Sequence, residues 1–335
     1  MLDGKRILIT GGTGSFARNF LKHILQSSKP EIVRIYSRDE HKQTELLGSY
    51  GGIRGGEQNS PVRGFIGDIR DLDRLRMAME DIDIVIHAAA LKQVQSCEYN
   101  PLETIKTNIY GSQNVVQAAL DCNVEKVLAI STDKAVAPLN LYGSTKMVME
   151  KLFINANSYR GKNHRTKFAC TRYGNVADSR GTVVHIWKGQ ISRGEPLSVT
   201  DFDATRFWLT MKEANQFVME CIDNMTHFDG GEIFCPRIPS ITVQSLLCAM
   251  TPENYPVNVI GARIGDKLHE DLILKEEIPY TMLFNGKYVI MPQDPSWKYD
   301  RPAMITTDLS REHNLTSGNN NEFLDSEQIR QTLQG

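Results

Sequence analysis

The sequence predicts an α/β protein with a parallel sheet and a smaller second lobe. Between residues 5 and 172, apolar runs of strand length alternate with helical stretches, as in successive βαβ units. The first apolar run leads directly into a glycine-rich turn and a helix. After Tyr173 the alternation loosens, and turns interrupt shorter elements. These observations predict a Rossmann-type doubly wound sheet over residues 1–172. They also predict a smaller substrate-binding lobe over residues 173–335, with room for segments of that lobe to return to the first domain.

The individual elements follow from the spacing of apolar residues and turn formers. The strands expected in the first domain are residues 7–10, 32–36, 62–66, 84–87, 127–130 and 168–172. Residues 48–61 contain two glycine pairs, break both periodicities, and therefore predict a surface loop before the third strand. Residues 317–321 predict a polar turn before a short terminal helix, which is capped by Asp325 or Ser326.

Composition argues against several classes of function. A formal net charge of −2 disfavours a nucleic-acid-binding protein, which needs a basic surface, so a small-molecule partner is expected. No apolar run reaches membrane-spanning length, and Met1 runs almost directly into the first strand without a signal peptide. We therefore expect a cytoplasmic protein with no membrane partner. The six cysteines are scattered without CxxC spacing, which indicates reduced thiols and no bound metal.

The glycine-rich turn predicts a dinucleotide site. It reads Thr10-Gly11-Gly12-Thr13-Gly14-Ser15-Phe16-Ala17 and opens a helix rich in apolar residues. Glycines let the backbone approach a pyrophosphate, which the helix N-terminus then binds. Ala17 occupies the third small position, where the motif accepts Gly or Ala. The expected cofactor contacts in this turn are Gly11, Thr13, Gly14, Ser15 and Phe16.

The residues after the second strand indicate which dinucleotide binds. An acidic side chain there would hold the ribose hydroxyls of NAD, whereas the chain has Ser37 and Arg38. Serine and arginine favour a 2′-phosphate and hence NADP, while Asp39 and Glu40, which follow directly, leave NAD as the alternative. Further cofactor contacts are expected at Lys42, Asp68, Ile69, Ala88 and Ala89.

Four side chains after the fifth strand predict acid/base chemistry. Asp133 and Lys134 emerge at the carboxyl end of that strand, the edge at which open α/β sheets bind ligands. Tyr142 and Lys146 lie four residues apart on a helix, so we expect the Lys146 ammonium to lie beneath the Tyr142 hydroxyl and to lower its pKa. In a desolvated site the pKa of Lys134 would fall, which makes it a candidate base with Asp133 as the acid. The sequence leaves open which of the two is acid and which is base.

Two sets of motifs carry a family resemblance. The glycine turn, His87-Ala88-Ala89-Ala90, Asn108 and Tyr142-xxx-Lys146 resemble, in this order, an extended short-chain dehydrogenase/reductase. Six further segments resemble the inverting UDP-N-acetylglucosamine 4,6-dehydratases, a polysaccharide-biosynthesis group that includes the pseudaminic-acid enzymes: residues 36–40, 131–135, 140–143, 172–176, 205–208 and 265–270. The chain departs from that group's pattern at Gln93, Gln95 and Ile264.

The resemblance implies a reaction and a set of site residues. It implies dehydration of UDP-N-acetylglucosamine, or a close UDP-sugar, with inversion at C5, using tightly bound NADP that is regenerated in each cycle. It also implies a homo-oligomer. Cofactor contacts implied in addition are Lys92, Asn108, Tyr142 and Lys146, and implied substrate contacts are Lys92, Thr132, Asn175, Thr200, Arg206 and Arg263. Thr132 is also implied as a catalytic residue, which would orient the sugar 4-hydroxyl by a hydrogen bond. His269 and Glu270 do not form an HExxH motif, and their roles stay open.

Two other functions fit parts of the pattern. An epimerase or reductase of the same superfamily would share the cofactor turn, Tyr142 and Lys146, but would need a different group at Asp133 and Lys134. A non-catalytic NADP-binding regulator could be built on the same fold, since fold does not dictate function. Such a regulator would not need both the tyrosine and the lysine, and the chain has both.

Overall fold

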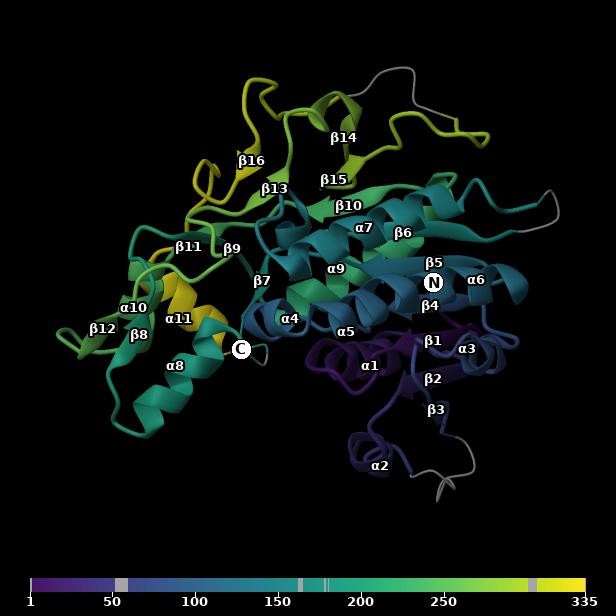
Figure 1. The fold of residues 1–335 in the computed structure, drawn as a ribbon, viewed down its shortest axis with the longest axis horizontal. Coiled ribbons are helices and arrows are strands. Elements are labelled where there is room, and N and C mark those ends of the chain that lie inside the picture. Colours follow the sequence, from purple (N-terminus) through teal and green to yellow (C-terminus); the bar gives the residue numbers. More distant parts are fainter. Residues whose placement is uncertain are drawn as a thin grey trace.

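A nine-stranded sheet organises the part of the chain that this computed structural model describes, namely residues 2–51, 60–161, 165–177, 179, 181–300 and 306–334. Its spatial order is β14-β15-β10-β6-β5-β4-β1-β2-β3 (Figure 1). The strands are β1 (Arg6–Thr10), β2 (Ile32–Ser37), β3 (Val62–Ile66), β4 (Ile84–His87), β5 (Lys126–Ile130), β6 (Lys167–Thr171), β10 (Ile233–Pro236), β14 (Thr281–Phe284) and β15 (Lys287–Ile290). Strands β1 to β6 and β10 run parallel, whereas β14 and β15 are antiparallel additions at one edge.

The predicted doubly wound sheet is confirmed. Each of the six expected strands is present, with ends that differ from the prediction by at most one residue. The order β3-β2-β1 turns back at β4-β5-β6, so the strand order reverses between β1 and β4. Ile7 pairs with Val33 on one side and Ile84 on the other, which fixes the register at this reversal. Ligands of open α/β sheets bind at such a reversal, outside the carboxyl ends of the strands. Most of the predicted loop at residues 48–61 lies outside the described residues.

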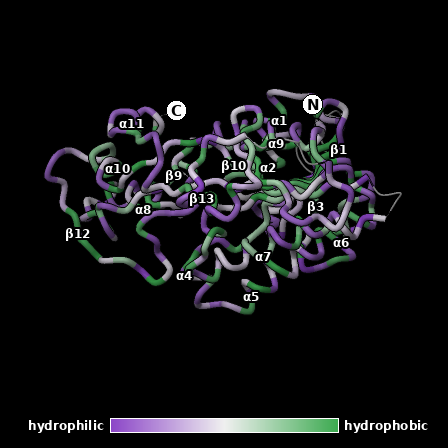
Figure 2. The backbone as a smooth tube through the Cα atoms, turned by 90° about the horizontal axis from the view of Figure 1, so that it is seen from above, coloured by the Kyte–Doolittle hydropathy of each residue, from purple (hydrophilic) through white to green (hydrophobic). Residues whose placement is uncertain are grey.

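Helices cover both faces of the sheet and enclose two apolar cores. One face carries α1 (Ser15–Ser27), α2 (Glu40–Gly48) and α9 (Met211–Asn224), and the other carries α3 (Leu72–Met79), α6 (Gly111–Asp121) and α7 (Leu141–Ala156). The first core includes Phe20 and Phe217, and the second includes Phe153 and Phe168. Apolar segments accordingly concentrate along the sheet, while polar segments lie toward the periphery (Figure 2). Strands buried on both faces need such continuous apolar runs.

A third core lies in the lobe formed by later residues. It packs around Trp187, Trp208 and Ile329. The elements of this region are β7 (Asn175–Val176), α8 (Val183–Ser192), β8 (Leu197–Val199), β9 (Thr205–Leu209), β11 (Ser240–Thr242), α10 (Val243–Met250), β12 (Val257–Val259) and α11 (Ser326–Gln334). Figure 1 shows α8, α10, α11 and the β8–β12 ribbon gathered to one side of the parallel strands. The Asp325 carboxylate accepts a 2.8 Å hydrogen bond from the backbone N–H of Gln328, so the predicted cap of the terminal helix is confirmed.

A buried ion network joins the sheet to a segment that arrives much later in the chain. Arg172, just after β6, pairs with Glu150 of α7 at 2.7 Å and with Glu277 at 2.9 Å. The Ser131 hydroxyl donates a 2.6 Å hydrogen bond to Glu150, so both carboxylates and the guanidinium are well partnered. Glu277 lies between β13 (Asp271–Ile273), which pairs with β16 (Leu315–Thr316), and β14. The network therefore fixes the 271–281 segment against the carboxyl ends of β5 and β6.

The structure gives one finding on membrane-spanning helices and one on disulfides. None of the described helices is long and apolar enough to cross a membrane. All six cysteines fall within the described ranges, and none is paired with another.

Candidate active site

The turn after β1 has the conformation that a pyrophosphate site requires. Gly11 has a φ of 66°, and a Cβ at that position would lie 2.8 Å from the Ala89 Cα atom. Gly14 is the N-cap of α1, and its N–H donates to the Gly11 carbonyl oxygen at 2.9 Å. The turn thus lies against the segment after β4, and the amino end of α1 opens at the same edge of the sheet. Only glycine allows this approach, and the helix N-terminus favours an anion.

A cavity of about 240 Å³ opens beside this turn. The predicted cofactor residues on its wall are Gly11, Thr13, Ser37, Arg38, Lys42, Asp68, Ile69 and Ala89. The others on the wall are Tyr36, Asp39, Gly67, Ala90 and Thr107. Tyr36 and Thr107 are not among the predicted contacts, although each immediately precedes one in the sequence. The predicted cofactor residues outside this wall are Gly14, Ser15, Phe16, Ala88, Lys92, Asn108, Tyr142 and Lys146.

The charged residues at the end of β2 are arranged in pairs. Arg38 lies 3.6 Å from Asp68, which also pairs with Arg70 at 2.7 Å. Burial raises the pKa of Asp68, but the hydrogen bonds and charges of the two arginines outweigh it and lower the pKa. The Asp39 carboxylate caps α2 and pairs with Lys42 at 2.6 Å. Arg38 is therefore held at the cavity wall, while both Asp39 oxygens already accept hydrogen bonds from Lys42.

A fully buried histidine lies beneath the cofactor turn. His87 bonds to the Thr10 hydroxyl at 2.8 Å and to the Ser112 hydroxyl at 3.0 Å. The Thr10 hydroxyl in turn accepts a 3.3 Å hydrogen bond from the Ala89 N–H. Burial, together with the charge of Lys146, lowers the pKa of His87 to about 3. The neutral imidazole thus supports the backbone at the reversal between β1 and β4 without adding charge.

Asp133 lies at the carboxyl end of β5, in a 3₁₀ turn (Asp133–Ala135) that Thr132 caps. Its side chain has no solvent exposure. One carboxylate oxygen accepts hydrogen bonds from the Thr132 hydroxyl at 2.9 Å and from the Lys134 ammonium at 3.1 Å. Burial raises the pKa of Asp133, and the neighbouring Glu270 carboxylate adds to that rise against the opposing charge of Lys134. Enclosure of the carboxyl group therefore favours the protonated form of Asp133.

Lys134 does not have the lowered pKa that the sequence suggests. Its ammonium lies 3.1 Å from Asp133 and 3.1 Å from Glu270, and 3.4 Å from the Asn175 amide oxygen. Burial alone would lower the pKa of Lys134, but the two carboxylates outweigh it and raise the pKa. The prediction of a partly neutral lysine is therefore wrong for this arrangement, because it did not include the second carboxylate.

The relation predicted between Tyr142 and Lys146 is also wrong. Asn140 caps α7, and both side chains lie in its first turns as expected. However, the Lys146 ammonium donates to the Ile130 carbonyl oxygen at 2.6 Å and contacts the Met149 sulfur at 3.0 Å. Burial raises the pKa of Tyr142 to about 12, and the charges that act on it come from Lys134 and Asp133 instead. Burial lowers the pKa of Lys146 to about 8.

Asn108 and Lys92 organise the segment after β4. Asn108 lies in a π-helical turn (Lys106–Tyr110). Its amide accepts from the Leu91 N–H at 2.8 Å and donates to the Leu91 carbonyl oxygen at 2.9 Å and to the Thr145 hydroxyl at 3.0 Å. Asn108 therefore ties this segment to α7. Lys92 donates a 3.2 Å hydrogen bond to the Ser179 hydroxyl, and burial lowers its pKa.

The predicted substrate contacts divide into two groups. Thr132, Asn175 and Arg206 lie around the Asp133–Lys134 pair, with Arg206 placed 3.9 Å from Glu270. Arg263 pairs with Asp266 at 2.9 Å in an exposed loop, and Thr200 follows β8. Among the described residues, no hydrogen bond or ion pair joins Arg263 or Thr200 to the Asp133–Lys134 pair.

Glu270 belongs to this cluster but is not among the predicted site residues. It is 3% exposed, and it reaches Lys134 from the segment before β13. In the sequence, Glu270 is the last residue of the 265–270 motif. The sequence shows only that it is not part of an HExxH zinc motif, and this does not assign it a role. No cluster of potential metal ligands occurs in the described part of the chain.

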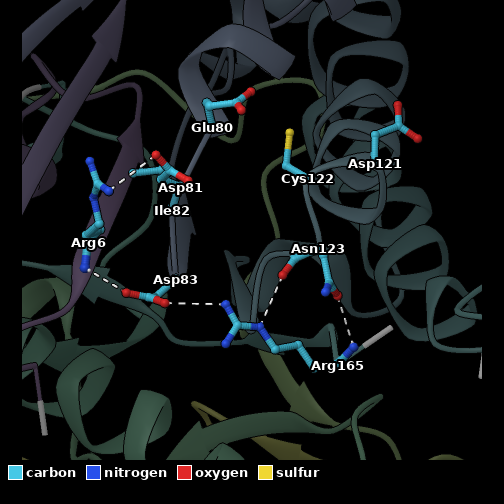
Figure 3. A pocket seen from close by; sticks show the side chains of 9 residues that line it. All are labelled: Arg6, Glu80, Asp81, Ile82, Asp83, Asp121, Cys122, Asn123 and Arg165. Carbon is cyan, nitrogen blue, oxygen red and sulfur yellow. Dashed lines mark hydrogen bonds and ion pairs between the residues drawn. The ribbon is translucent and has the colours of Figure 1, made fainter. Parts of the chain in front are cut away.

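A second hollow, of about 540 Å³, lies at the opposite, amino-terminal edge of the sheet (Figure 3). Four of its charged groups are already paired: Arg6 with Asp81 at 3.4 Å, and Arg165 with Asp83 at 3.4 Å. Because open α/β sheets bind ligands at the carboxyl edge, the cavity beside Gly11 and the cluster around Asp133 define the site.

The sheet order and the glycine turn define a Rossmann-type α/β protein with a turn suited to a dinucleotide. The chain belongs to the polysaccharide biosynthesis protein family, whose profile matches residues 7–292.

Several relatives are named for nucleotide-sugar enzymes. The UDP-N-acetylglucosamine 4,6-dehydratase (inverting) of Campylobacter jejuni strain 81-176 is 47% identical over 293 residues, which cover 87% of this chain and 84% of that protein. The UDP-glucose 4-epimerase of Rickettsia bellii is 38% identical over 301 residues, covering 88% and 84%.

Solved structures share the fold. The X-ray structure of Pen from Bacillus thuringiensis has a TM-score of 0.85 and 34% identity, covering 100% of this chain and 98% of that one. The dTDP-glucose 4,6-dehydratase DesIV from Streptomyces venezuelae, solved with NAD and TYD bound, has a TM-score of 0.66 and 19% identity. It covers 78% of this chain and 86% of its own, and its likeness concerns the fold alone.

Proposed function

We propose that this chain dehydrates UDP-N-acetylglucosamine to the 4-keto-6-deoxy sugar nucleotide, with inversion at C5. The observation that carries the proposal is the ion pair between the buried Asp133 and the partly exposed Lys134 at the end of β5, whose charges act on Tyr142. Elimination of water requires a base at C5 and an acid at the C6 hydroxyl, in addition to the tyrosine that the whole superfamily shares. The relative from Campylobacter jejuni, named for this reaction, supports the same choice.

The movement of one proton within the pair can produce both the acid and the base. Lys134 and Asp133 share a hydrogen bond of 3.1 Å, so one proton can move from the ammonium to the carboxylate. That transfer leaves a neutral amine beside a carboxylic acid. In this proposal the amine takes the C5 proton, and Asp133 donates its proton to the C6 hydroxyl, which leaves as water. The raised pKa of Asp133 favours the transfer because it lowers the cost of the protonated carboxyl.

Tyr142 is the proposed acceptor of the C4 hydroxyl proton, with Thr132 orienting that hydroxyl. In the chain as described, burial holds the pKa of Tyr142 near 12, so a cation must enter the site before the phenolate forms. Bound NADP supplies the hydride acceptor for oxidation at C4, the hydride donor for reduction at C6, and a positive nicotinamide ring. Lys146 is proposed to support the tyrosine indirectly, because it joins α7 to the end of β5 through the Ile130 carbonyl oxygen.

NADP rather than NAD is part of the proposal. The residues at the 240 Å³ cavity fit a dinucleotide with a 2′-phosphate, because Arg38 stands at the wall and Ser37 is beside it. Asp39, the acidic residue that follows Arg38 in the chain, already accepts hydrogen bonds from Lys42 through both oxygens and is therefore poorly placed to bind the ribose hydroxyls of NAD. Arg206, Arg263, Lys92, Asn175 and Thr200 remain the proposed contacts of the UDP-sugar.

The proposal also covers the oligomeric state and the cellular compartment of the enzyme. Apolar side chains at Tyr99, Leu102, Tyr110 and Leu139 are exposed around α4 (Val94–Tyr99), α5 (Pro101–Ile105) and the start of α7, which supports a homo-oligomer. Unpaired cysteines throughout the described chain suit a reducing compartment, in line with the cytoplasm.

Incubation with UDP-N-acetylglucosamine in deuterated water tests the function directly. We expect a product that has lost one water, carries deuterium at C5 and shows the inverted C5 configuration by NMR. An unchanged sugar-nucleotide mass with altered C4 configuration would instead establish the epimerase, the activity for which the Rickettsia bellii relative is named. Tight NADP binding with no turnover of any UDP-sugar would establish a non-catalytic regulator.

A further inference from the structure

The backbone of Glu270 is held in place by hydrogen bonds to Ser317. Its N–H donates to the Ser317 hydroxyl at 2.9 Å, and its carbonyl oxygen accepts from the Ser317 N–H at 2.8 Å. The Ser317 hydroxyl also bonds to that of Thr205 on β9 at 2.7 Å. Two segments that are distant from it in the chain, one at Ser317 and one at Thr205, therefore fix where the Glu270 side chain starts. Such double attachment reduces the freedom of the side chain before it makes any contact with the sheet.

The Glu270 carboxylate then reaches the catalytic pair. One oxygen lies 3.1 Å from the Lys134 ammonium, which is the same distance that separates Lys134 from Asp133. The other oxygen is buried and receives no hydrogen bond from any described residue, as is also true of the second oxygen of Asp133. Lys134 is thus a single cation between two buried carboxyl groups that come from distant segments of the chain.

We propose that Glu270 is a positioning residue for the dehydration, which fixes Lys134 between two carboxyls and holds a proton on the Asp133–Lys134 pair. The inference rests on the proposed function and names a residue that this function does not otherwise require. Its physical basis is that a negative charge close to both members of the pair makes removal of a proton from either one less favourable.

The surrounding charges place the negative charge on Glu270 itself. Burial raises the pKa of Glu270, but Lys134, Arg206 and Lys267 outweigh it, so the pKa is lowered. Asp133 has only Lys134 as a cation and has Glu270 as an anionic neighbour, so its pKa is raised. The proton therefore resides on the pair and not on Glu270.

The remaining groups around the pair are few. Tyr142 faces it from α7, and Thr132 and Asn175 face it as neutral hydrogen-bonding groups. Cys97 of α4 acts on Tyr142, and Arg206 of β9 acts on Glu270 and Lys134. None of these groups places a negative charge next to Lys134. Apart from Asp133, the negative charge that acts on Lys134 comes from Glu270, so replacing Glu270 isolates the effect of that charge on the pair.

The pH dependence of kcat/KM in Glu270→Gln tests the inference. Loss of the negative charge lowers the pKa of both Asp133 and Lys134, so both limbs of the profile should move to lower pH, by about one pH unit or more. This direction is the same whichever member of the pair is the acid. Glu270→Asp retains the charge and should keep the limbs close to those of the wild-type enzyme.

Asp271→Asn is the matched control. Asp271 is the next residue in the chain and is an acidic partner of Lys267 at 2.7 Å, but it does not contact the pair. Its replacement removes one negative charge from the adjacent position in the chain and should leave both limbs in place. Reduced activity of Glu270→Gln at every pH, with unmoved limbs, would show that Glu270 is merely structural and would overturn the inference.

Infrared titration of the Asp133 carboxyl separates this inference from the proposed function. The band of the protonated acid, assigned by its loss in Asp133→Asn, should persist above the ordinary pKa range of aspartate and should titrate at lower pH in Glu270→Gln. This readout needs no turnover, so a protein that fails to dehydrate the sugar can still be scored. If Glu270→Gln does not fold, an ordinary aspartate titration in the wild-type protein would overturn the inference.

Discussion

The Lys146 ammonium donates a 2.6 Å hydrogen bond to the carbonyl oxygen of Ile130, the last residue of β5. This bond joins the helix that carries Tyr142 to the strand that leads into Asp133. The two halves of the proposed chemistry, the shared redox tyrosine and the eliminating pair, are thereby held in one frame. Lys146 acts here through the backbone, not through direct contact with the tyrosine hydroxyl.

Removal of the Tyr142 hydroxyl should stop the reaction at its first step. In Tyr142→Phe no side chain accepts the C4 hydroxyl proton, so kcat should fall by about 10²- to 10⁴-fold. Steady-state turnover of UDP-N-acetylglucosamine measures the loss. Tyr110→Phe, which changes an exposed tyrosine, is the control and should turn over normally. Normal activity in Tyr142→Phe would remove the tyrosine from the mechanism.

Replacement of Lys134 should separate oxidation from dehydration. Lys134→Ala retains Tyr142, so single-turnover absorbance should show NADPH forming while C5 exchange and loss of water fail. Lys134→Arg keeps a cation that can pair with both carboxylates, but its pKa is too high for a base. It should fold like the wild-type protein and show the same block. Dehydration at the wild-type rate in either variant contradicts the assignment.

Arg38 should decide the preference between the two dinucleotides. In Arg38→Ala the Kd for NADP should rise about ten- to a hundredfold, which is the worth of a lost charged hydrogen bond, while the Kd for NAD changes little. Fluorescence titration with both cofactors measures the two constants. Arg76→Ala, on the exposed surface of α3, provides the control. An equal loss for NAD and NADP would refute recognition of a 2′-phosphate.

His87 should make the protein sensitive to acid. Its pKa of about 3 lies below the unfolded value near 6.5, so between these pH values the unfolded chain binds more protons and stability rises with pH. As pH falls from 6.5 to 4.5, this group alone should cost roughly 2 kcal/mol of unfolding free energy. Urea unfolding of His87→Gln should show a correspondingly shallower fall. Exposed His185→Gln should follow the wild-type slope, and identical slopes in all three proteins would exclude the effect.

Loss of the Arg172 guanidinium should be costly to stability. Arg172→Met leaves the buried Glu150 and Glu277 carboxylates without their cation, which typically costs about 3 to 5 kcal/mol. Urea unfolding measures the difference. Arg193→Met removes an exposed, solvent-screened pair with Glu195 and should change the free energy of unfolding far less. Equal effects of the two replacements would show that the buried network does not contribute more than a surface pair.

Local sequence signals were sufficient for the first half of the fold and for its cofactor turn. Buried parallel strands are short apolar runs, and their ends were predicted to within one residue. After β1, β2, β3 and β5 the next α-helix has glycine, aspartate or asparagine at its N-cap. The turn at Gly11 could be predicted because its conformation depends on neighbours in sequence. The same reasoning placed Asp133 at the carboxyl end of β5.

Contacts between distant segments account for what sequence reasoning missed. Glu270 meets Lys134 only because Ser317 and Thr205 hold its segment, and no periodicity reports such a contact. The predicted fall in the pKa of Lys134 was wrong for that reason, because the second carboxylate raises the pKa. The misplaced Lys146 has a different cause: a shared helix face permits contact with Tyr142, but a carbonyl oxygen at the end of β5 competes for the same ammonium.

The pairing of β6 with β10 has a consequence for any attempt to divide the molecule. Cys170 and Thr171 of β6 lie opposite Ile233 and Phe234, which come from well beyond the cofactor half. A fragment ending at residue 172 would expose β6 as a bare, apolar edge strand, and such edges recruit other chains. It would also lack Glu277, one of the two carboxylate partners of Arg172, and the α9 helix that covers one face. A soluble cofactor-binding fragment would therefore have to extend through β15, and limited proteolysis is expected to yield no shorter stable core.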